Sequence, residues 1–134
     1  MKTGPHDGSY WLLVEDSDDD FWMFSRACSQ AFDTPPLVCR MADVQSAKEL
    51  LVQSSGLRDL VVSDINLPGE SGLDLLAWFR AQPSLQQIPF IILSDSQEGR
   101  DVSRASELSA DDYFGKPASV GALVRLVSEI DQVF

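Results

Sequence analysis

Acidic side chains stand directly after two short apolar runs. Residues 61–72 read VVSDINLPGESG, in which two valines lead into Asp64. The run YWLLV at 10–14 leads in the same way into Glu15 and Asp16. Three carboxylates close together would repel one another, and a hard divalent cation relieves that repulsion. An all-oxygen ligand set with room for waters suits Mg²⁺ better than zinc, so these residues predict a magnesium site.

Two later apolar runs are followed by residues that could bind a phosphoryl group. Ser94 comes directly after FIIL at 90–93 and offers a hydroxyl, and Lys116 comes soon after YF at 113–114. The Lys116 ammonium would be a point charge for phosphate oxygens or for a carboxylate. If Asp64 is a nucleophile, forming an aspartyl phosphate requires a metal and a lysine to offset the charge. The set therefore indicates phosphoryl transfer to Asp64.

Each of these residues has a simpler interpretation when it is taken alone. Asp64 could be an ordinary turn residue, because its side chain can bond to its own nearby backbone. Glu15 and Asp16, with three more Asp following, could cap a helix and form a solvated acidic face. Lys116 could be a surface lysine and Ser94 a loop hydroxyl. Their joint occurrence at strand ends favours a site over four coincidences.

The elements that must position these residues follow from the hydrophobic pattern. Short apolar runs, mostly β-branched or aromatic, predict five strands, at residues 10–14, 37–41, 60–63, 90–93 and 113–114. Apolar residues at helical spacing predict five helices between and after them, at residues 18–32, 44–54, 72–82, 98–109 and 119–134. This alternation indicates an α/β, doubly wound (βα)5 fold with a parallel sheet in order 2-1-3-4-5. In that order the first and third strands are neighbours, so their carboxylates should meet.

The composition indicates one globular domain. The 134 residues are 44% hydrophobic, enough for one core but without room for a second folded module. The 21 acidic and 10 basic residues give a formal charge of -11, which repels nucleic-acid phosphates and anionic lipids. No apolar run reaches the roughly 20 residues that span a bilayer. We therefore expect a soluble, cytoplasmic protein without direct nucleic-acid binding or membrane insertion.

Other kinds of site lack the residues they need. Cys28 and Cys39 have no CxxC spacing and no secretory segment beside them, which argues against a disulfide framework or a zinc site. The only histidine, His6, lies in a polar stretch rich in Gly and Pro, so residues 1–9 are predicted to be a flexible tail. Ser-His-Asp catalysis therefore has no histidine at the predicted site.

Taken together, four motifs resemble those of a known family. They are LLVEDSDDD, DINLPGESGLDLL, IILSDS and DDYFGKP. Over residues 10–134 the sequence resembles a response-regulator receiver domain of two-component phosphorelays, which implies a flavodoxin-like fold. No output domain is expected after the fifth helix. The resemblance is to the stand-alone receivers, of the chemotaxis-like or phytochrome-associated type, and implies a signalling protein, not an enzyme.

The resemblance implies a role for each residue of the predicted metal site. Asp64 would be the phosphoacceptor. Glu15 and Asp16 would be the acidic pair that holds Mg²⁺ together with Asp64. The backbone carbonyl of Asn66, two residues past the acceptor, would be a further metal ligand.

The remaining roles concern switching and partners. Ser94 would be the switch hydroxyl, Tyr113 the switch aromatic, and Lys116 the counter-charge of the phosphoryl group. The bond from Lys116 to Pro117 is often cis in this family. The donor would be a sensor histidine kinase or a histidine phosphotransfer protein. A downstream protein target would bind the surface of the fourth helix, fifth strand and fifth helix.

Several alternatives remain open from the sequence. Asp95, where receivers usually have a small residue, could disturb phosphotransfer or simply point to solvent, and it leaves open a degenerate receiver that binds partners without phosphorylation. A Mg²⁺-dependent phosphohydrolase of the haloacid-dehalogenase type would need an Asp where Asn66 stands. Trp22 could contact the phosphodonor or cover the rim of its own core. Phe134 and neighbouring apolar residues could support a homodimer.

Overall fold

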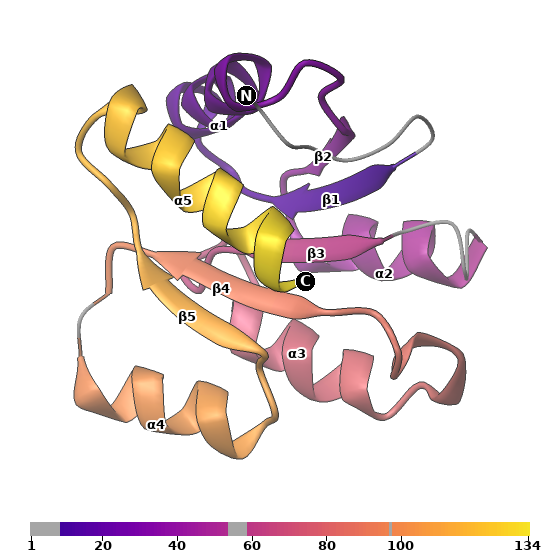
Figure 1. The fold of residues 1–134 in the computed structure, drawn as a ribbon. Helices are drawn as coiled ribbons and strands as arrows, with labels where there is room; N and C mark the ends of the chain where they lie inside the picture. The colour runs from indigo at the N-terminus through magenta and orange to yellow at the C-terminus, as the bar shows by residue number, and fades with distance from the viewer. Residues whose placement is uncertain (1–8, 54–58, 97) are drawn as a thin grey trace.

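The computed structural model describes residues 9–53, 59–96 and 98–134, and these form a five-stranded parallel sheet with helices on both faces (Figure 1). The strand order is β2-β1-β3-β4-β5, which confirms the predicted order 2-1-3-4-5. The strands are β1 (Tyr10–Val14), β2 (Leu37–Met41), β3 (Leu60–Ser63), β4 (Phe90–Ser94) and β5 (Asp112–Gly115). The first and third strands are therefore neighbours, as the site requires.

The helices divide between the two faces of the sheet. α1 and α5 pack together on one face, and α2 and α3 lie on the other (Figure 1). Their bounds are α1 (Asp18–Ala31), α2 (Val44–Gln53), α3 (Gly72–Arg80), α4 (Gly99–Glu107) and α5 (Val120–Val133). A short 3-10 turn, Pro83–Leu85, follows α3. All five predicted helices are present, with ends within a few residues of those expected.

The central strands are apolar on both sides because both faces of the sheet are covered. In β1, Trp11 and Leu13 belong to the core beneath α1 and α5, whereas Leu12 and Val14 belong to the core on the opposite face. Every residue of β3 is buried. This double burial explains why these strands read as continuous apolar runs instead of alternating with polar residues.

Side-chain caps define where four of the helices begin, and at α2 the Asp43 carboxylate accepts the Ser46 N–H at 2.8 Å. The Ser17 hydroxyl accepts the Asp20 N–H at the start of α1, and the Ser119 hydroxyl accepts the Ala122 N–H at the start of α5. Ser71 and Asp74 form a reciprocal capping box at the start of α3. Within the described residues, Glu98, the N-cap residue of α4, makes no side-chain cap hydrogen bond. The first turn of α4 is held instead by the Ser96 hydroxyl, which donates to the Asp101 carboxylate at 2.5 Å.

α3 and α4 also differ in how they are anchored elsewhere. The Arg80 guanidinium at the end of α3 donates to the carbonyls of Ser109 and Ile88 at 3.0 and 3.1 Å, and pairs with Asp111 at 2.6 Å. Within α4, all of which the structure describes, Ala105 is the one buried residue. α3 is thus hydrogen-bonded to the loops beside it, whereas α4 contributes only the small side chain of Ala105 to the buried core.

Several sequence expectations concern the surface of this fold. Trp22 is 56% exposed, so it does not fold over the rim of the core. No cis peptide bond occurs among the described residues, so the bond before Pro117 is trans, unlike the form common in the family. Most of the predicted tail, residues 1–8, lies outside the described residues. Within the described segments, no helix has the length and apolar character needed to cross a membrane.

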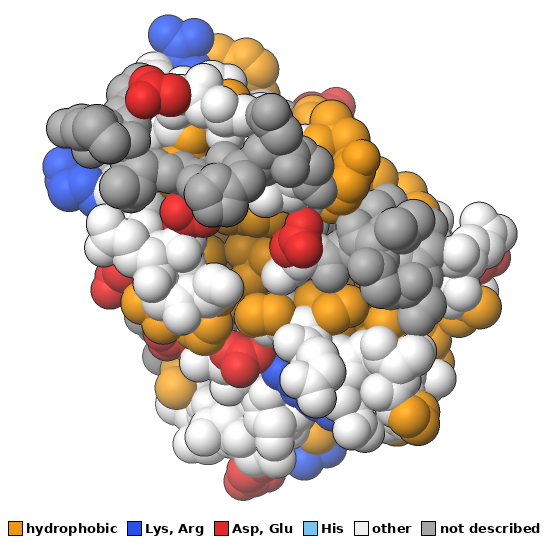
Figure 2. Space-filling view, turned by 45° about the vertical axis from the view of Figure 1, so that its right-hand side comes forward, with side chains coloured by type: hydrophobic (Ala, Val, Ile, Leu, Met, Phe, Trp, Pro, Cys, Tyr) orange, Lys and Arg blue, Asp and Glu red, His pale blue; other side chains and the backbone are white. Residues whose placement is uncertain are grey.

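The acidic surplus does not gather on the face shown in Figure 2. Among the described side chains visible there, acidic and basic groups are scattered between hydrophobic and neutral polar ones. Several large apolar side chains of the domain are well exposed, including Leu37 on the edge strand β2 and Val52 near the end of α2. Scattered apolar exposure of this kind is normal for a soluble domain surface.

Gly72, the first residue of α3, packs directly against the backbone of Asp64. A Cβ added to Gly72 would lie 1.8 Å from the Asp64 carbonyl oxygen, far inside van der Waals contact. The Gly72 N–H also donates to the Ile65 carbonyl at 2.9 Å. Only a residue without a side chain can bring the start of α3 this close to the end of β3.

Replacing Gly72 by alanine tests this close approach. We expect Gly72→Ala to lower the free energy of unfolding by at least about 2 kcal/mol, because the methyl group must displace backbone. Gly121, in the first turn of α5, has nothing within 4 Å of an added Cβ. Gly121→Ala should therefore be neutral or stabilising by about 0.5 kcal/mol. Urea denaturation of both variants measures this, and equal stability of the two would contradict the structure.

Candidate functional site

The ends of β1 and β3 bring three carboxylates together. Val14 pairs with Ser63 in the sheet, and the Asp64 N–H donates to the Val14 carbonyl at 3.0 Å. The next residues, Glu15 and Asp16 from β1 and Asp64 from β3, offer carboxylate oxygens that all lie within 4.8 Å of one another. The predicted convergence of Glu15, Asp16 and Asp64 is therefore present.

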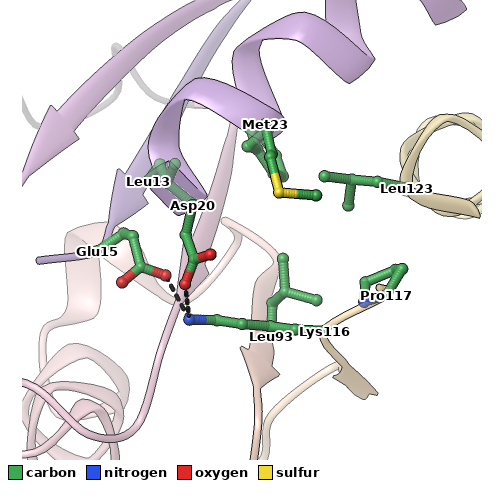
Figure 3. A pocket seen from close by; sticks show the side chains of 9 residues that line it. Leu13, Glu15, Asp20, Met23, Leu93, Lys116, Pro117 and Leu123 are labelled. Atoms are coloured by element: carbon green, nitrogen blue, oxygen red, sulfur yellow. Dashed lines mark hydrogen bonds and ion pairs between the residues drawn. The ribbon is translucent and has the colours of Figure 1, made fainter. Parts of the chain in front are cut away.

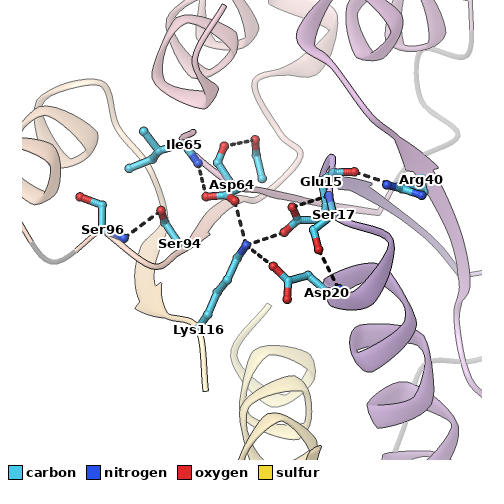
Figure 4. Close-up of polar contacts among 10 residues, drawn as sticks. Glu15, Ser17, Asp20, Arg40, Asp64, Ile65, Ser94, Ser96 and Lys116 are labelled. Atoms are coloured by element: carbon cyan, nitrogen blue, oxygen red, sulfur yellow. Dashed lines mark hydrogen bonds and ion pairs between the residues drawn. The ribbon is translucent and has the colours of Figure 1, made fainter. Parts of the chain in front are cut away.

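Asp64 is buried and held at both carboxylate oxygens. Its side chain is 9% exposed. Oδ1 accepts the Ile65 N–H at 2.7 Å, and Oδ2 accepts from Lys116 Nζ at 2.8 Å (Figure 4). The Ser63 hydroxyl donates to the Asp64 carbonyl at 2.8 Å. These contacts fix both the backbone and the side chain at the end of β3.

The Lys116 ammonium lies among three carboxylates (Figure 4). Nζ is 2.7 Å from Glu15 Oε1, 2.7 Å from Asp20 Oδ2 and 2.8 Å from Asp64 Oδ2. The Lys116 N–H also donates to the Ser94 carbonyl at 3.0 Å, which places the residue at the end of β5. Burial alone would lower the pKa of Lys116, but hydrogen bonds to the three carboxylates raise it well above its ordinary value. Lys116 therefore stays charged.

Glu15 is nearly as buried, and its charge is only partly compensated. Burial raises the pKa of the Glu15 carboxyl, while the hydrogen bond from Lys116 and the backbone N–H of Ser17 oppose that rise. The negative charge of Asp64 nearby raises the pKa of Glu15 further. The site thus carries more negative charge than Lys116 alone offsets.

The donor set fits a divalent cation. Asp16 is exposed while Glu15 and Asp64 are buried, so the cluster opens to solvent on one side. Its ligand atoms are all carboxylate oxygens, which hard divalent cations prefer and zinc does not. The pKa of Glu15 is raised mainly by burial and to a lesser extent by the charge of Asp64, and an added positive charge would oppose both effects. Asn66 follows in the loop after β3 and is exposed.

Ser94 and Tyr113 are linked through the backbone of Ser96. Ser94 is the last residue of β4 and fully buried, and its hydroxyl oxygen accepts the Ser96 N–H at 3.2 Å. The Tyr113 hydroxyl donates to the Ser96 carbonyl at 2.8 Å, and burial raises the pKa of Tyr113. Asp95, which lies between Ser94 and Ser96 in the sequence, is exposed, and this agrees with the alternative that its side chain points to solvent. A change at Ser94 would therefore reach Tyr113 through one loop residue.

Two residues of this arrangement were not identified from the sequence. Asp20 was included only in an acidic run suited to a helix N-terminus, yet its carboxylate contacts Lys116. Ser96 was part of a motif without a role of its own, yet it connects Ser94 to Tyr113. A pairing of Asp20 with Lys116 could have been sought from the packing of the first helix against the fifth, because Lys116 lies just before that helix. Nothing in the sequence singles out Ser96.

Comparison with known proteins agrees with this geometry. The family model described as "Response regulator receiver domain" matches residues 12–128. The chain belongs to this family. The receiver is 29% identical over 126 residues to "Response regulator Rcp1" of Synechocystis sp., covering 90% of this chain and 84% of that protein. It is 32% identical over 119 residues to "Transcriptional regulatory protein GltR" of Pseudomonas aeruginosa, covering 89% of this chain but only 47% of that protein.

Solved structures show the same relationship. A crystal structure of the phosphorylated cyanobacterial phytochrome response regulator RcpA superposes with a TM-score of 0.83 at 28% identity, covering 92% of this receiver and 91% of that chain. The Mn²⁺-bound form of response regulator Rcp1 gives a TM-score of 0.79 at 27% identity, covering 92% of each chain. The expected resemblance to phytochrome-associated receivers is confirmed.

Removing the Lys116 charge tests the electrostatic balance of the site. We expect Lys116→Met to lower the free energy of unfolding by about 3 kcal/mol at pH 8, because buried carboxylates lose their counter-charge. The pKa of Glu15, already raised in the folded state, would rise further. The folded variant then keeps a proton that the unfolded chain releases above pH 4.5, so its stability falls more steeply than that of the wild type as the pH rises above this value.

The matched control for this substitution is Lys48→Met. Lys48 pairs with Glu70 at 3.5 Å, and half of the Glu70 side chain is exposed. Such a surface pair contributes less than about 1 kcal/mol, so this variant should keep the pH dependence of the wild type. Urea denaturation at several pH values compares the two. A Lys116→Met stability that does not change with pH relative to wild type would contradict the electrostatic account.

Cation binding to the acidic cluster is measurable through stability. A cation present at 100 times its dissociation constant should add about 2.7 kcal/mol to the free energy of unfolding. Asp16→Asn should abolish most of that gain, because it removes the exposed ligand of the cluster. Asp33→Asn, at an exposed position just after α1, should leave it intact. Thermal melts with and without Mg²⁺ or Mn²⁺ give the result, and equal cation effects in both variants would contradict the site.

Proposed function

We propose that this receiver accepts a phosphoryl group on Asp64 and acts as a phosphorylation-controlled switch in a two-component phosphorelay. The main support is the position of the Asp64 carboxylate, which lies 2.8 Å from the Lys116 ammonium and within the acidic cluster. A nucleophile needs nearby positive charge to approach an anionic phosphoryl group. Membership of the receiver family supports the same role.

The proposed donor is a phosphohistidine of a sensor histidine kinase or of a histidine phosphotransfer protein. One oxygen of the Asp64 carboxylate attacks the phosphorus atom, and a new O–P bond forms as the N–P bond to the imidazole breaks. The electron pair of the broken bond passes to the imidazole nitrogen, which takes up a proton. The product on the receiver is an aspartyl phosphate.

Residues around Asp64 would prepare this step. We propose that Glu15, Asp16 and Asp64 hold Mg²⁺, with the backbone carbonyl of Asn66 as a further ligand. When bound, the ion offsets charge on the phosphoryl oxygens. Lys116, which directly follows β5, supplies a second positive charge and keeps it at every ordinary pH because its pKa is raised. The existence of a Mn²⁺-bound form of the relative Rcp1 supports divalent-cation binding by this receiver.

The proposed response begins at Ser94 and Tyr113. The Ser94 hydroxyl turns toward the phosphoryl group and releases the Ser96 N–H that it accepts in this structure. Because the Tyr113 hydroxyl donates to the Ser96 carbonyl, its side chain moves with that loop. The surface of α4, β5 and α5 then changes its affinity for a downstream protein. Exposed Trp22 on α1 would contact the phosphodonor, since aromatic residues are enriched at interfaces.

Labelling with a small phosphodonor tests the assignment of Asp64. We expect acetyl phosphate to label the protein in a Mg²⁺-dependent reaction at neutral pH. Hydroxylamine should remove the label, because it cleaves acyl phosphates such as an aspartyl phosphate. Asp64→Asn should reduce labelling to background. The control Asp33→Asn makes the same chemical change at an exposed position and should label like the wild type.

Other outcomes would contradict the proposal in distinct ways. Unchanged labelling of Asp64→Asn would place the acceptor elsewhere. Absence of labelling in the wild type, with cation binding intact, would indicate a degenerate receiver that binds partners without phosphorylation. Multiple-turnover hydrolysis of a phosphate ester would indicate a phosphohydrolase, for which the chain has Asn66 at the position that needs an acid.

A further inference from the structure

Asp20 contacts the site but has no role in the reaction as proposed above. It is the third residue of α1, and its N–H donates to the capping hydroxyl of Ser17 at 3.2 Å. This backbone contact fixes the position from which the side chain starts. The Asp20 carboxylate then reaches Lys116, with Oδ2 2.7 Å from Nζ (Figure 3). The neighbouring Asp19 is exposed, so proximity to the helix start does not by itself produce this contact.

The three partners of the Lys116 ammonium are not equivalent. An ammonium has three N–H donors, and here they match the carboxylates of Glu15, Asp20 and Asp64. Glu15 and Asp64 also belong to the cluster that fits a divalent cation. Within the described residues, Asp20 is not a member of that cluster. Of the three carboxylates that contact Lys116, Asp20 is therefore the one outside the proposed metal site.

A cation in the cluster would weaken the other two contacts of Lys116. Oxygens of Glu15 and Asp64 would be shared with the cation, and two positive charges so close repel each other. The contact with Asp20 would be the least affected, because this carboxylate lies outside the ligand set. Asp20 would then hold the ammonium in place when the site is ready for phosphotransfer.

The surroundings of Lys116 restrict where the ammonium can go. Its side chain is 12% exposed and borders a pocket of about 30 Å³. Apolar side chains from α1, β4 and α5 wall this pocket, among them Met23, Leu93 and Leu123 (Figure 3). A pocket of this size holds at most about two water molecules. On the pocket side, few water molecules can therefore replace a lost carboxylate as a partner of the ammonium, and solvent reaches Lys116 mainly past Asp20, whose side chain is 36% exposed.

We propose that Asp20 is a positioning residue, whose carboxylate keeps the Lys116 ammonium directed at Asp64 while the acidic cluster holds a divalent cation. The inference rests on the proposed role of Asp64 as phosphoacceptor. It assigns to the first turn of α1 a direct influence on phosphotransfer, apart from any contact of that helix with a partner.

The kinetic test is a double-mutant cycle. At saturating Mg²⁺, Asp20→Asn should slow labelling by acetyl phosphate about tenfold, within the range of couplings found between contacting residues. In a Lys116→Met background the same substitution should change the rate less than about twofold, because the partner of Asp20 is gone. Asp19→Asn, with the same charge change one residue away, should match the wild type. An equal effect of Asp20→Asn in both backgrounds would overturn the proposal.

A second measurement observes Lys116 without phosphorylation. The chain has three lysines, so ¹⁵N-lysine NMR can follow the Lys116 ammonium, with Lys116→Met as the assignment control. With Mg²⁺ bound, we expect its protons to exchange with water at least about tenfold faster in Asp20→Asn than in wild type, as hydrogen exchange reports opening of a contact. Unchanged exchange would overturn the proposal. If the wild type were not labelled at all, that result would count against Asp64 as the acceptor. The exchange rate of the Lys116 protons would still test the role of Asp20, because it does not depend on phosphorylation.

Calorimetric titration with Mg²⁺ separates positioning from metal binding. Asp20→Asn should keep the Mg²⁺ affinity within about twofold, because a neutral side chain outside the ligand set changes only the surrounding charge. Asp16→Asn should lose at least about tenfold, the loss typical of groups that hold a metal. If Asp20→Asn lost as much affinity as Asp16→Asn, Asp20 would be a metal ligand and the proposal would be wrong.

Discussion

One buried ammonium holds together the four segments that build the site. Lys116 follows β5, and its three partners come from the end of β1, the first turn of α1 and the end of β3. Without that positive charge, Glu15 and Asp64 would be two nearly buried carboxylates facing each other, an arrangement that strongly disfavours ionisation of both. The geometry of the sheet edge and the charge state of its acids therefore depend on the same residue. A divalent cation would add to this balance, because the acids still outnumber the lysine.

Much of this was predictable because it depends on periodic patterns. The five strands followed from short apolar runs, and the strand order followed from the rule for doubly wound sheets. Once β1 and β3 are neighbours, any side chains directly after them must lie at one edge, so Glu15, Asp16 and Asp64 were expected to meet. Lys116 followed in the same way from the end of β5. Membership of the receiver family agrees with each of these placements.

The roles of the residues that the sequence did not reveal depend on how the helices are oriented against the sheet, and the hydrophobic periodicity of the sequence does not contain this orientation. Three consecutive acids, ending with Asp20, all suit a helix N-terminus, and only the rotation of α1 against the sheet decides which one faces inward. Ser96 matters through its backbone N–H and carbonyl, which carry no side-chain signature. Position 72 needs glycine because a Cβ at this position would lie only 1.8 Å from the backbone carbonyl oxygen of Asp64. These are distances between elements, which a one-dimensional pattern does not encode.

The unequal anchoring of α3 and α4 has a mechanical consequence. α3 is clamped at both ends, by Gly72 against the end of β3 and by Arg80 against three loop partners. α4 has one buried side chain, Ala105, and its preceding loop carries Ser96, which binds both Ser94 and Tyr113. A displacement that starts at Asp64 would therefore be resisted by the firmly anchored α3 and less resisted by α4. We infer that a change at Asp64 would displace α4 more readily than α3, because α3 buries four residues against the core and α4 buries one.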